Sequence, residues 1–470
     1  MRKRKLLALV LSLVLLWGCQ AQSLPVQTTQ PKAVAFTGDL DAYELRHTGK
    51  WEKAWEEDIL FFAEKYLTEH SRVSDRNFFT EYALDLSGEA EIVFDNSAFD
   101  PELRAEFVAA VDALLASIPE RTDGSIINEM RRIVVMLGDI HSGVYPGEED
   151  FGEVLSVCYE PFYREDGVDF RVSLISENKK ELMLAKLVSY NGIPIDQVVE
   201  RISAYFSHES EEALGFMLTQ YLQFTGLNGK EILCAAGIVE EKDLSVVAEF
   251  ETEEGIVTHR LSFRDPYNLP ELEFHPMLTE ESLRNSSTDP YWWTMADEKT
   301  VYARLTTMVD DYAMGYTIDN LFSEVRTAMR DAGEPLKVIL DFRGNGGGYV
   351  HESSLKGFVS ATEWYDHDGV YILIDGNCFS AGVLAPYYLR QAIDGAKLVG
   401  APTGQGLWFP ANSAWYELPN SGVSFSVGDE IVCAQQGWED CALRPDVEVY
   451  ETLEDYKAGV DTVLAWAMAD

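Results

Sequence analysis

The stretch that decides the fold is Val338-Ile-Leu-Asp-Phe-Arg-Gly-Asn-Gly-Gly-Gly348, an apolar run that ends in a glycine-rich turn. A second run of the same kind, Tyr371-Ile-Leu-Ile-Asp-Gly-Asn-Cys-Phe-Ser-Ala-Gly382, ends in a serine. Such runs are typical of buried parallel strands that deliver their C-terminal ends to a site. We therefore expect exposed backbone N–H groups and a serine hydroxyl at one sheet edge, as an oxyanion hole and a nucleophile require.

Two simpler interpretations compete with this one. Ser380 stands where a strand gives way to a helix, so it is also an obvious N-cap. The glycine turn is also consistent with a tight turn that closes a buried strand. Nucleotide binding is not favoured, because a dinucleotide fingerprint needs glycine where Tyr349 stands and the Gly-Lys-Ser/Thr of a phosphate loop is absent.

The pattern around these runs predicts an α/β fold. Apolar strand-like segments alternate with a helical stripe through residues 318–329 and a second helix after Ser380. The expected strands are 301–305, 338–340, 371–374 and 397–399. We assign residues 299–470 to this unit and residues 266–298, rich in Pro, Asn and Ser, to a connector.

The upstream part predicts two further regions. Apolar residues at helical spacing, with a cap at Asp100-Pro101, indicate a helical region over residues 41–143. Short alternating runs and an Asn191-Gly192 turn predict a β-rich domain over residues 144–265, of a size that often binds peptides by strand addition.

The N-terminus reads as an export signal. Residues 1–19 combine a basic start, a short apolar run and a terminal Gly18-Cys19, which resembles a bacterial lipoprotein signal with Cys19 as the lipidated residue. An ordinary secretory signal is the alternative. Residues 20–40 would form the tether. Both interpretations place the chain outside the cytoplasm, and the first anchors it to the membrane by lipid alone.

Charge and cysteine content exclude several classes. The chain carries 79 acidic against 37 basic residues, a formal charge of −42, which argues against nucleic-acid binding. No cysteine or histidine spacing resembles a metal site, so neither metal nor cofactor is implied. Cys433 and Cys441 flank a turn-like segment and are the candidate disulfide pair.

A serine needs a general base, and histidine is the usual one. Of the 8 histidines, His141 is distinctive, because Leu137-Gly-Asp-Ile-His-Ser-Gly143 holds it in a glycine-bounded turn after a helix. Taken alone, such a histidine is more often structural. Cys378 is an alternative nucleophile that would leave Ser380 without a role.

Together these motifs resemble the C-terminal processing and tricorn-like family of serine peptidases. Residues 338–348 look like its Asp-x-Arg-Gly-Asn-x-Gly-Gly motif, residues 377–382 like its nucleophile turn, and residues 138–142 like the Gly-Asp-x-His-Thr segment of the histidine-using branch. The resemblance implies a ClpP/crotonase-like α/β peptidase core, an N-terminal helical region, and a PDZ-like identity for the β-rich insert. It also implies peptide or protein substrates.

Carried onto this chain, the resemblance makes Ser380 the nucleophile and His141 its general base. The oxyanion donors would be the backbone N–H groups of Ala381 and of Gly346 or Gly347. Gln405 occupies the place of the lysine base in the bacterial processing branch, and glutamine cannot serve as a base, so a Ser/Lys dyad is excluded.

The resemblance also implies a third residue that orients His141. Glu439 is the candidate, with Asp440 and Asp139 as rivals and a solvated turn acid as the simple alternative for Glu439. Ile140 replaces the serine that tricorn has at this position, which would alter the relay. We therefore expect an exported serine endopeptidase, with a noncatalytic peptide- or lipid-binding protein on the same scaffold as the alternative.

Overall fold

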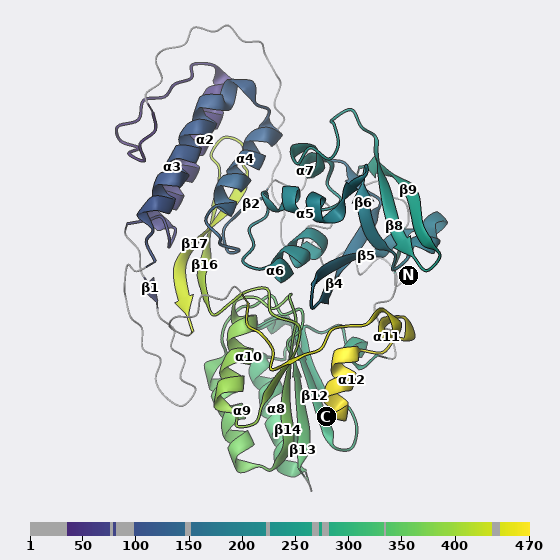
Figure 1. The fold of residues 1–470 in the computed structure, drawn as a ribbon. Coiled ribbons are helices and arrows are strands. Elements are labelled where there is room, and N and C mark those ends of the chain that lie inside the picture. Colours follow the sequence, from purple (N-terminus) through teal and green to yellow (C-terminus); the bar gives the residue numbers. More distant parts are fainter. Residues whose placement is uncertain are drawn as a thin grey trace.

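The computed structural model describes residues 35–75, 79–80, 98–145, 152–221, 226–265, 272–274, 282–332, 335–434 and 442–470. Three sheets organise these residues, and helices cover them as Figure 1 shows. The expected α/β class is confirmed. Within the described ranges, no helix is both long and apolar enough to cross a bilayer.

The C-terminal part is built on a six-stranded sheet of order β11-β12-β13-β14-β15-β18, parallel except for the antiparallel edge strand β11. Helices α8, α9 and α10 pack on one face of this sheet and α12 packs on the other. Side chains of β13 alternate between the two faces, so Val338 and Leu340 join the core under α8 to α10, and Ile339 joins the core under α12. The strands are β11 (Tyr291–Met295), β12 (Thr300–Leu305), β13 (Leu336–Asp341), β14 (His367–Ile374), β15 (Lys397–Gly400) and β18 (Val447–Glu448). The helices are α8 (Ile318–Asp331), α9 (Glu352–Trp364), α10 (Ala381–Ala392), α11 (Leu453–Ala458) and α12 (Thr462–Ala469).

The expected strands and helices of this unit are present, with one addition. Strand β11 lies inside the stretch that the sequence analysis assigns to a connector, and it extends the sheet at its edge. Its Tyr291 is buried and its Trp292 nearly so. The aromatic cluster of residues 291–293 is therefore part of the sheet.

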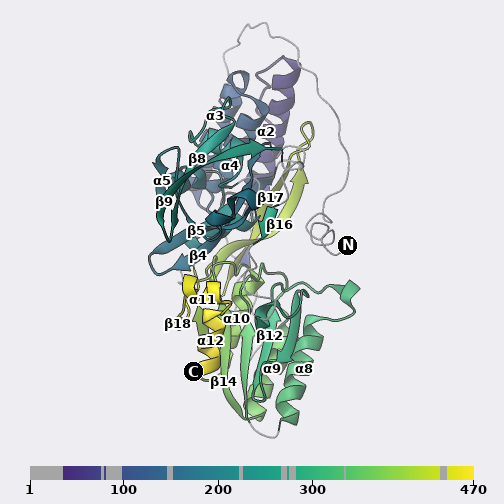
Figure 2. The same ribbon diagram turned by 90° about the vertical axis from the view of Figure 1, so that its right-hand side faces the viewer.

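The N-terminal helices form a second layer with the hairpin of β16 and β17, which comes from the C-terminal part of the chain. The core of this layer includes Phe425 and Val427 of β17, and the hairpin lies along the helices in Figures 1 and 2. The helices are α2 (Lys50–Glu69), α3 (Pro101–Ser117) and α4 (Asp123–Val135). The sheet contains β1 (Phe79–Thr80), β2 (Gly143–Tyr145), β16 (Trp408–Glu417) and β17 (Ser424–Cys433).

This hairpin lies within residues 299–470 of the sequence but packs on the N-terminal helices. Asp58 of α2 is fully buried and holds the turn of the hairpin against this helix. Its carboxylate accepts hydrogen bonds from the N–H groups of Asn420 and Ser421, which lie between β16 and β17. As expected from the sequence, α3 begins with Pro101 after the Asp100 side chain has capped its first N–H groups.

The β-rich part forms an eight-stranded sheet of order β10-β5-β6-β8-β9-β3, with β4 on β5 and β7 on β6. Asn191 and Gly192 both have positive φ between β6 and β7, as the Asn-Gly pattern predicts. The strands are β3 (Val154–Leu155), β4 (Val157–Arg164), β5 (Gly167–Ser176), β6 (Lys186–Tyr190), β7 (Ile193–Pro194), β8 (Ser245–Thr252), β9 (Gly255–Arg264) and β10 (Leu272–Phe274). The helices are α5 (Ile195–Ser203), α6 (Glu211–Phe216) and α7 (Lys230–Ala235).

Candidate active site

The glycine turn after β13 and the serine turn after β14 lie against each other. Phe379 N donates to Asn345 O at 3.0 Å, and Gly344 N donates to Asp375 Oδ1 at 3.0 Å. Asn345 is fully buried, and its side chain also donates to Leu305 O of β12 at 3.0 Å. Parallel strands thus bring the two turns to one sheet edge, as the sequence predicts.

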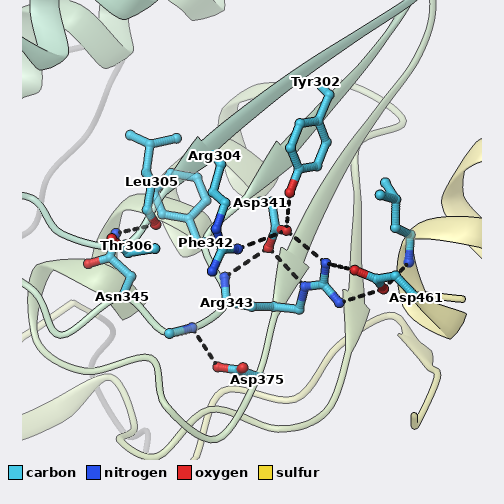
Figure 3. Close-up of polar contacts among 12 residues, drawn as sticks. Tyr302, Arg304, Leu305, Thr306, Asp341, Phe342, Arg343, Asn345, Asp375 and Asp461 are labelled. Carbon is cyan, nitrogen blue, oxygen red and sulfur yellow. Dashed lines mark hydrogen bonds and ion pairs between the residues drawn. The ribbon is translucent and has the colours of Figure 1, made fainter. Parts of the chain in front are cut away.

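A buried ion network explains the Asp-x-Arg part of the first turn (Figure 3). The Arg343 guanidinium pairs with both oxygens of Asp341, at 2.9 and 2.7 Å, and with both oxygens of Asp461, at 2.8 and 2.7 Å. Tyr302 and Arg304 also donate to Asp341. Burial alone would raise the pKa of Asp341, but the two arginines outweigh it and hold the pKa well below its usual range. The network fixes the strand end from which the glycine turn starts.

Ser380 lies at a sharp strand-to-helix turn between β14 and α10. Its φ is +52° and its ψ is −127°, a conformation that is strained for a residue with a side chain. Ser380 is the N-cap residue of α10, as the sequence predicts, but its side chain makes no capping hydrogen bond. The hydroxyl group is therefore not committed to the helix.

Gly347 packs against this turn so closely that a Cβ atom would lie 2.7 Å from Ser380 Cβ. The expected oxyanion donors nevertheless differ in their availability. Gly346 N donates to Thr306 O at 3.3 Å and Gly347 N to the Asn345 side chain at 2.9 Å. Among the described residues, the N–H of Ala381 donates no hydrogen bond.

His141 lies in the turn between α4 and β2, held by the hairpin. Its carbonyl oxygen accepts from Ser413 Oγ at 2.7 Å and from Ser426 Oγ at 2.9 Å, and its ring stacks on Phe409. Burial lowers the pKa of His141, although the charge of Asp139 and a hydrogen bond with the Pro410 backbone oppose the shift. A neutral imidazole at neutral pH is the form that can accept a proton.

Among the described residues, Asp139 is the nearest carboxylate to this ring, with its Oδ1 3.9 Å from His141 Nδ1. It is fully buried, and it accepts from His70 Nε2 at 3.2 Å, from the Ser142 hydroxyl and from the His141 N–H at 2.7 Å. Burial would raise the pKa of Asp139, but these hydrogen bonds and the two histidines outweigh it and lower the pKa. Asp139, a rival of Glu439 in the sequence, is thus an anion beside His141.

The side chain of Gln405 lies between the two candidate residues. Its Oε1 accepts from Ser380 N at 2.7 Å, and its Nε2 lies 3.5 Å from His141 Nδ1. The same Nε2 donates to Glu209 Oε1 at 2.9 Å. In the described part of the chain, no hydrogen bond joins the Ser380 hydroxyl directly to His141, so the Gln405 amide is the link between them.

Glu209 is the residue that the sequence analysis missed. It stands in Ser207-His-Glu-Ser-Glu-Glu212, which reads as a solvated charged run and carries no signal for a site. Asp139, His141 and Glu209 could together hold a metal ion, since their ligand atoms lie within 4.8 Å of one another. Both carboxylates, however, already accept hydrogen bonds from the protein.

Other predicted residues are placed as follows. Cys378 is buried, its Sγ donates to Phe342 O at 3.1 Å, and burial raises the pKa of the thiol well above its usual value, which disfavours a thiolate nucleophile. Glu439, Asp440, Cys441 and Cys19 lie outside the described residues. The choice of Glu439 and the pairing of Cys433 with Cys441 therefore stay predictions.

Comparison with protein-family models and with curated proteins gives no match. Solved structures do match: mature CPAF complexed with lactacystin aligns at a TM-score of 0.57 and 14% identity, over 90% of this chain and 98% of that chain. The chain has the fold of CPAF. A second structure of mature CPAF gives a TM-score of 0.52, also at 14% identity, over 89% of this chain and 96% of that one.

The tricorn protease aligns at a TM-score of 0.39 and 12% identity, over 88% of this chain and 36% of that chain. CPAF is itself a tail-specific-protease-like serine protease. The two CPAF alignments confirm, at the level of the fold, the resemblance to C-terminal processing and tricorn-like peptidases that the motifs predict. The chemistry has to be argued from the side chains of this chain.

Proposed function

We propose that this protein is an exported serine endopeptidase that cleaves peptide bonds through an acyl-enzyme on Ser380, with His141 as the general base. The observation that carries the proposal is the Gln405 amide, which holds Ser380 N through Oε1 and approaches His141 Nδ1 through Nε2. It brings a strained serine and a neutral histidine to one place. Both are partly exposed, so a substrate can reach them.

In the proposed reaction, a rotation of the Ser380 side chain directs its hydroxyl to the imidazole. Ser380 Oγ attacks the scissile carbonyl carbon as its proton passes to His141, and His141 then protonates the leaving amine. Asp139, an anion 3.9 Å from Nδ1, stabilises the imidazolium that forms between these steps. Water activated by His141 hydrolyses the acyl-enzyme and restores the serine.

The oxyanion of the tetrahedral intermediate needs two donors. We assign one to the N–H of Ala381, at the N-terminus of α10, where the helix dipole adds to its effect. The second would come from Gly346 or Gly347, whose peptide has to turn away from Thr306 or Asn345. Glycine permits that rotation.

The proposal extends to architecture and location. Residues 299–470 would form the ClpP/crotonase-like core, residues 41–143 the helical region, residues 144–265 a PDZ-like insert and residues 266–298 the connector. Residues 1–19 would direct export, with Cys19 as a lipid anchor and residues 20–40 as tether. The substrates would be peptides or unfolded proteins outside the cytoplasm, and Glu439 remains a candidate acid near His141.

Hydrolysis of a fluorescently labelled unfolded protein such as casein tests the proposal. The wild-type protein should cleave it, and Ser380→Ala and His141→Ala should each lower the rate by a factor of at least about a thousand. The control is Ser421→Ala, at the distant tip of the β16–β17 hairpin, which should cleave at the wild-type rate. Equal cleavage by wild type and Ser380→Ala would contradict the proposal.

A noncatalytic binding protein is the second candidate. The hydrogen bonds of the Gly346 and Gly347 N–H groups within the protein favour it, because they leave Ala381 as the available donor in the described site. A binding protein would hold the unfolded chain without cleaving it. Retention of intact casein by wild type, and equally by Ser380→Ala, would identify that function.

A further inference from the structure

Glu209 contacts both halves of the site with one oxygen atom. Its Oε1 accepts from Gln405 Nε2 at 2.9 Å and from Ile140 N at 3.3 Å. Ile140 precedes His141 in the chain, and Gln405 in turn accepts from Ser380 N. A single carboxyl group therefore joins the loop that carries the histidine to the amide that holds the serine turn.

The loop of Glu209 belongs to the β-rich part of the molecule, between α5 and α6, and its neighbours also contact the serine turn. Ser210 Oγ donates to Gly404 O at 2.9 Å, and the ring of Phe216 packs on Phe379 with centroids 5.2 Å apart. Tyr163 OH donates to the Asn377 side chain at 2.6 Å. These contacts hold the loop that carries Glu209 against the serine turn and Gly404.

We propose that Glu209 is a positioning residue of the Ser380 site: as a hydrogen-bond acceptor, it fixes Gln405 and the His141 loop relative to each other. The inference rests on the proposed peptidase function. It predicts that the site is complete only when the loop around Glu209 is docked on residues 404 and 405. In this proposal, the Gln405 side chain connects the β-rich part to the nucleophile turn, because it donates to Glu209 and accepts from Ser380 N.

The protonation state of Glu209 agrees with an acceptor role. Burial, together with the charge of Asp139, raises the pKa of Glu209 to about 8, while hydrogen bonds from Gln405 and Ile140 and the charge of Arg72 act against that rise. Near neutral pH the group is therefore mostly a neutral carboxyl. Its carbonyl oxygen can accept two hydrogen bonds without placing a second anion beside Asp139, and a glutamine would reproduce this form.

The rate at which a fluorophosphonate probe labels Ser380 tests this role. Glu209→Ala removes the acceptor of two partly buried hydrogen bonds and should slow labelling by roughly tenfold or more. Glu209→Gln keeps an acceptor oxygen of the same reach and should recover most of that loss. Glu211→Ala, an exposed acid two residues away, is the control and should label like wild type. A wild-type rate in a folded Glu209→Ala protein, or no recovery in Glu209→Gln, would overturn the proposal.

Amide hydrogen exchange tests the same role without catalysis. In Glu209→Ala, the peptides that contain Ile140 N and Ser380 N should exchange faster than in wild type, while Glu211→Ala should leave both unchanged. Should Glu209→Ala fail to fold, Gln405→Asn, which shortens the amide arm, should expose the Ser380 N–H. Unchanged exchange in these variants would refute the positioning role. Absence of wild-type labelling, by contrast, would refute the peptidase function alone.

Discussion

At the scale of single residues, the two glycines of the first turn are distinguishable by their surroundings. Gly347 has a φ of +93°, and a Cβ there would lie 2.7 Å from Ser380 Cβ and 2.8 Å from Phe379 O. Gly346 has open space where a Cβ would stand, and its φ is not in the left-handed region. An alanine should therefore be tolerated at position 346 and not at position 347.

We expect Gly347→Ala to lower the rate of Ser380 labelling by roughly a hundredfold, since the added methyl group displaces the nucleophile turn. Gly346→Ala should lower the rate by no more than about tenfold, because its methyl group would meet no other atom and only the rotation of its peptide is restricted. Labelling kinetics of the two purified variants, with circular dichroism to verify folding, check the prediction. Equal rates in the two variants would show that Gly347 does not constrain the serine.

Glu209 also has a consequence for stability against pH. Its folded-state pKa of about 8 lies above the usual 4.5. The protonated carboxyl therefore contributes stability that is fully present below about pH 4.5 and is lost as the pH rises to about 8. Glu209→Gln does not titrate, so the free energy of unfolding of wild type should fall relative to this variant across that window.

The change should be at most about 1.4 kcal/mol per pH unit and should level off above about pH 8. Urea unfolding of both proteins from about pH 5 to about pH 9 measures it. A difference that stays constant with pH would mean that Glu209 keeps an ordinary pKa in the fold.

Sequence reasoning can single out candidate residues that have local signals. Ser380 and His141 stand in glycine-bounded turns whose composition is informative in itself. Glu209 has no such signal, since its neighbours are polar and its partners, Gln405 and Ile140, are remote in the chain. Its role depends on burial that the folded structure alone creates.

At the scale of elements, the buried network links the end of β13 to the start of α12. Asp461 caps α12, accepting from Leu464 N at 2.9 Å, and pairs through both oxygens with Arg343. Asp461→Ala should lower the free energy of unfolding by about 3–5 kcal/mol, because it leaves a buried guanidinium without one partner. Urea unfolding is the measurement.

Asp470, at the other end of the same helix, provides the control. It pairs with Lys397 at the surface, so Asp470→Ala should unfold close to the wild-type urea midpoint. If Asp461→Ala were no more destabilising than Asp470→Ala, the network would not be what holds α12 to the sheet.

The alternation of strands and helices in residues 301–399 could be predicted because each buried parallel strand is a continuous apolar run. The hairpin of β16 and β17 could not be assigned to its layer in the same way. Its apolar residues specify that one face is buried, but not that the partner is the helical layer formed by α2 to α4. The Asp58 contact that fixes it joins residues at opposite ends of the chain.

At the scale of the whole molecule, the candidate site is assembled from three parts. Ser380 follows the six-stranded sheet, His141 follows the N-terminal helices, and Glu209 comes from the β-rich part, with Gln405 between them. The motifs in the sequence indicate Ser380 and His141, but they do not indicate that the β-rich part contributes Glu209. Because three parts form the site, the serine should react only in the folded, complete molecule.

In the proposed peptidase, Ser380 is a nucleophile that His141 activates. Treatment of the full chain with a fluorophosphonate probe, followed by mass spectrometry of its peptides, measures this activation. We predict one adduct, on Ser380, that is absent in Ser380→Ala, strongly reduced in His141→Ala and lost after unfolding in urea. No adduct on Ser380 in the folded wild-type protein, or undiminished labelling in His141→Ala, would contradict the account.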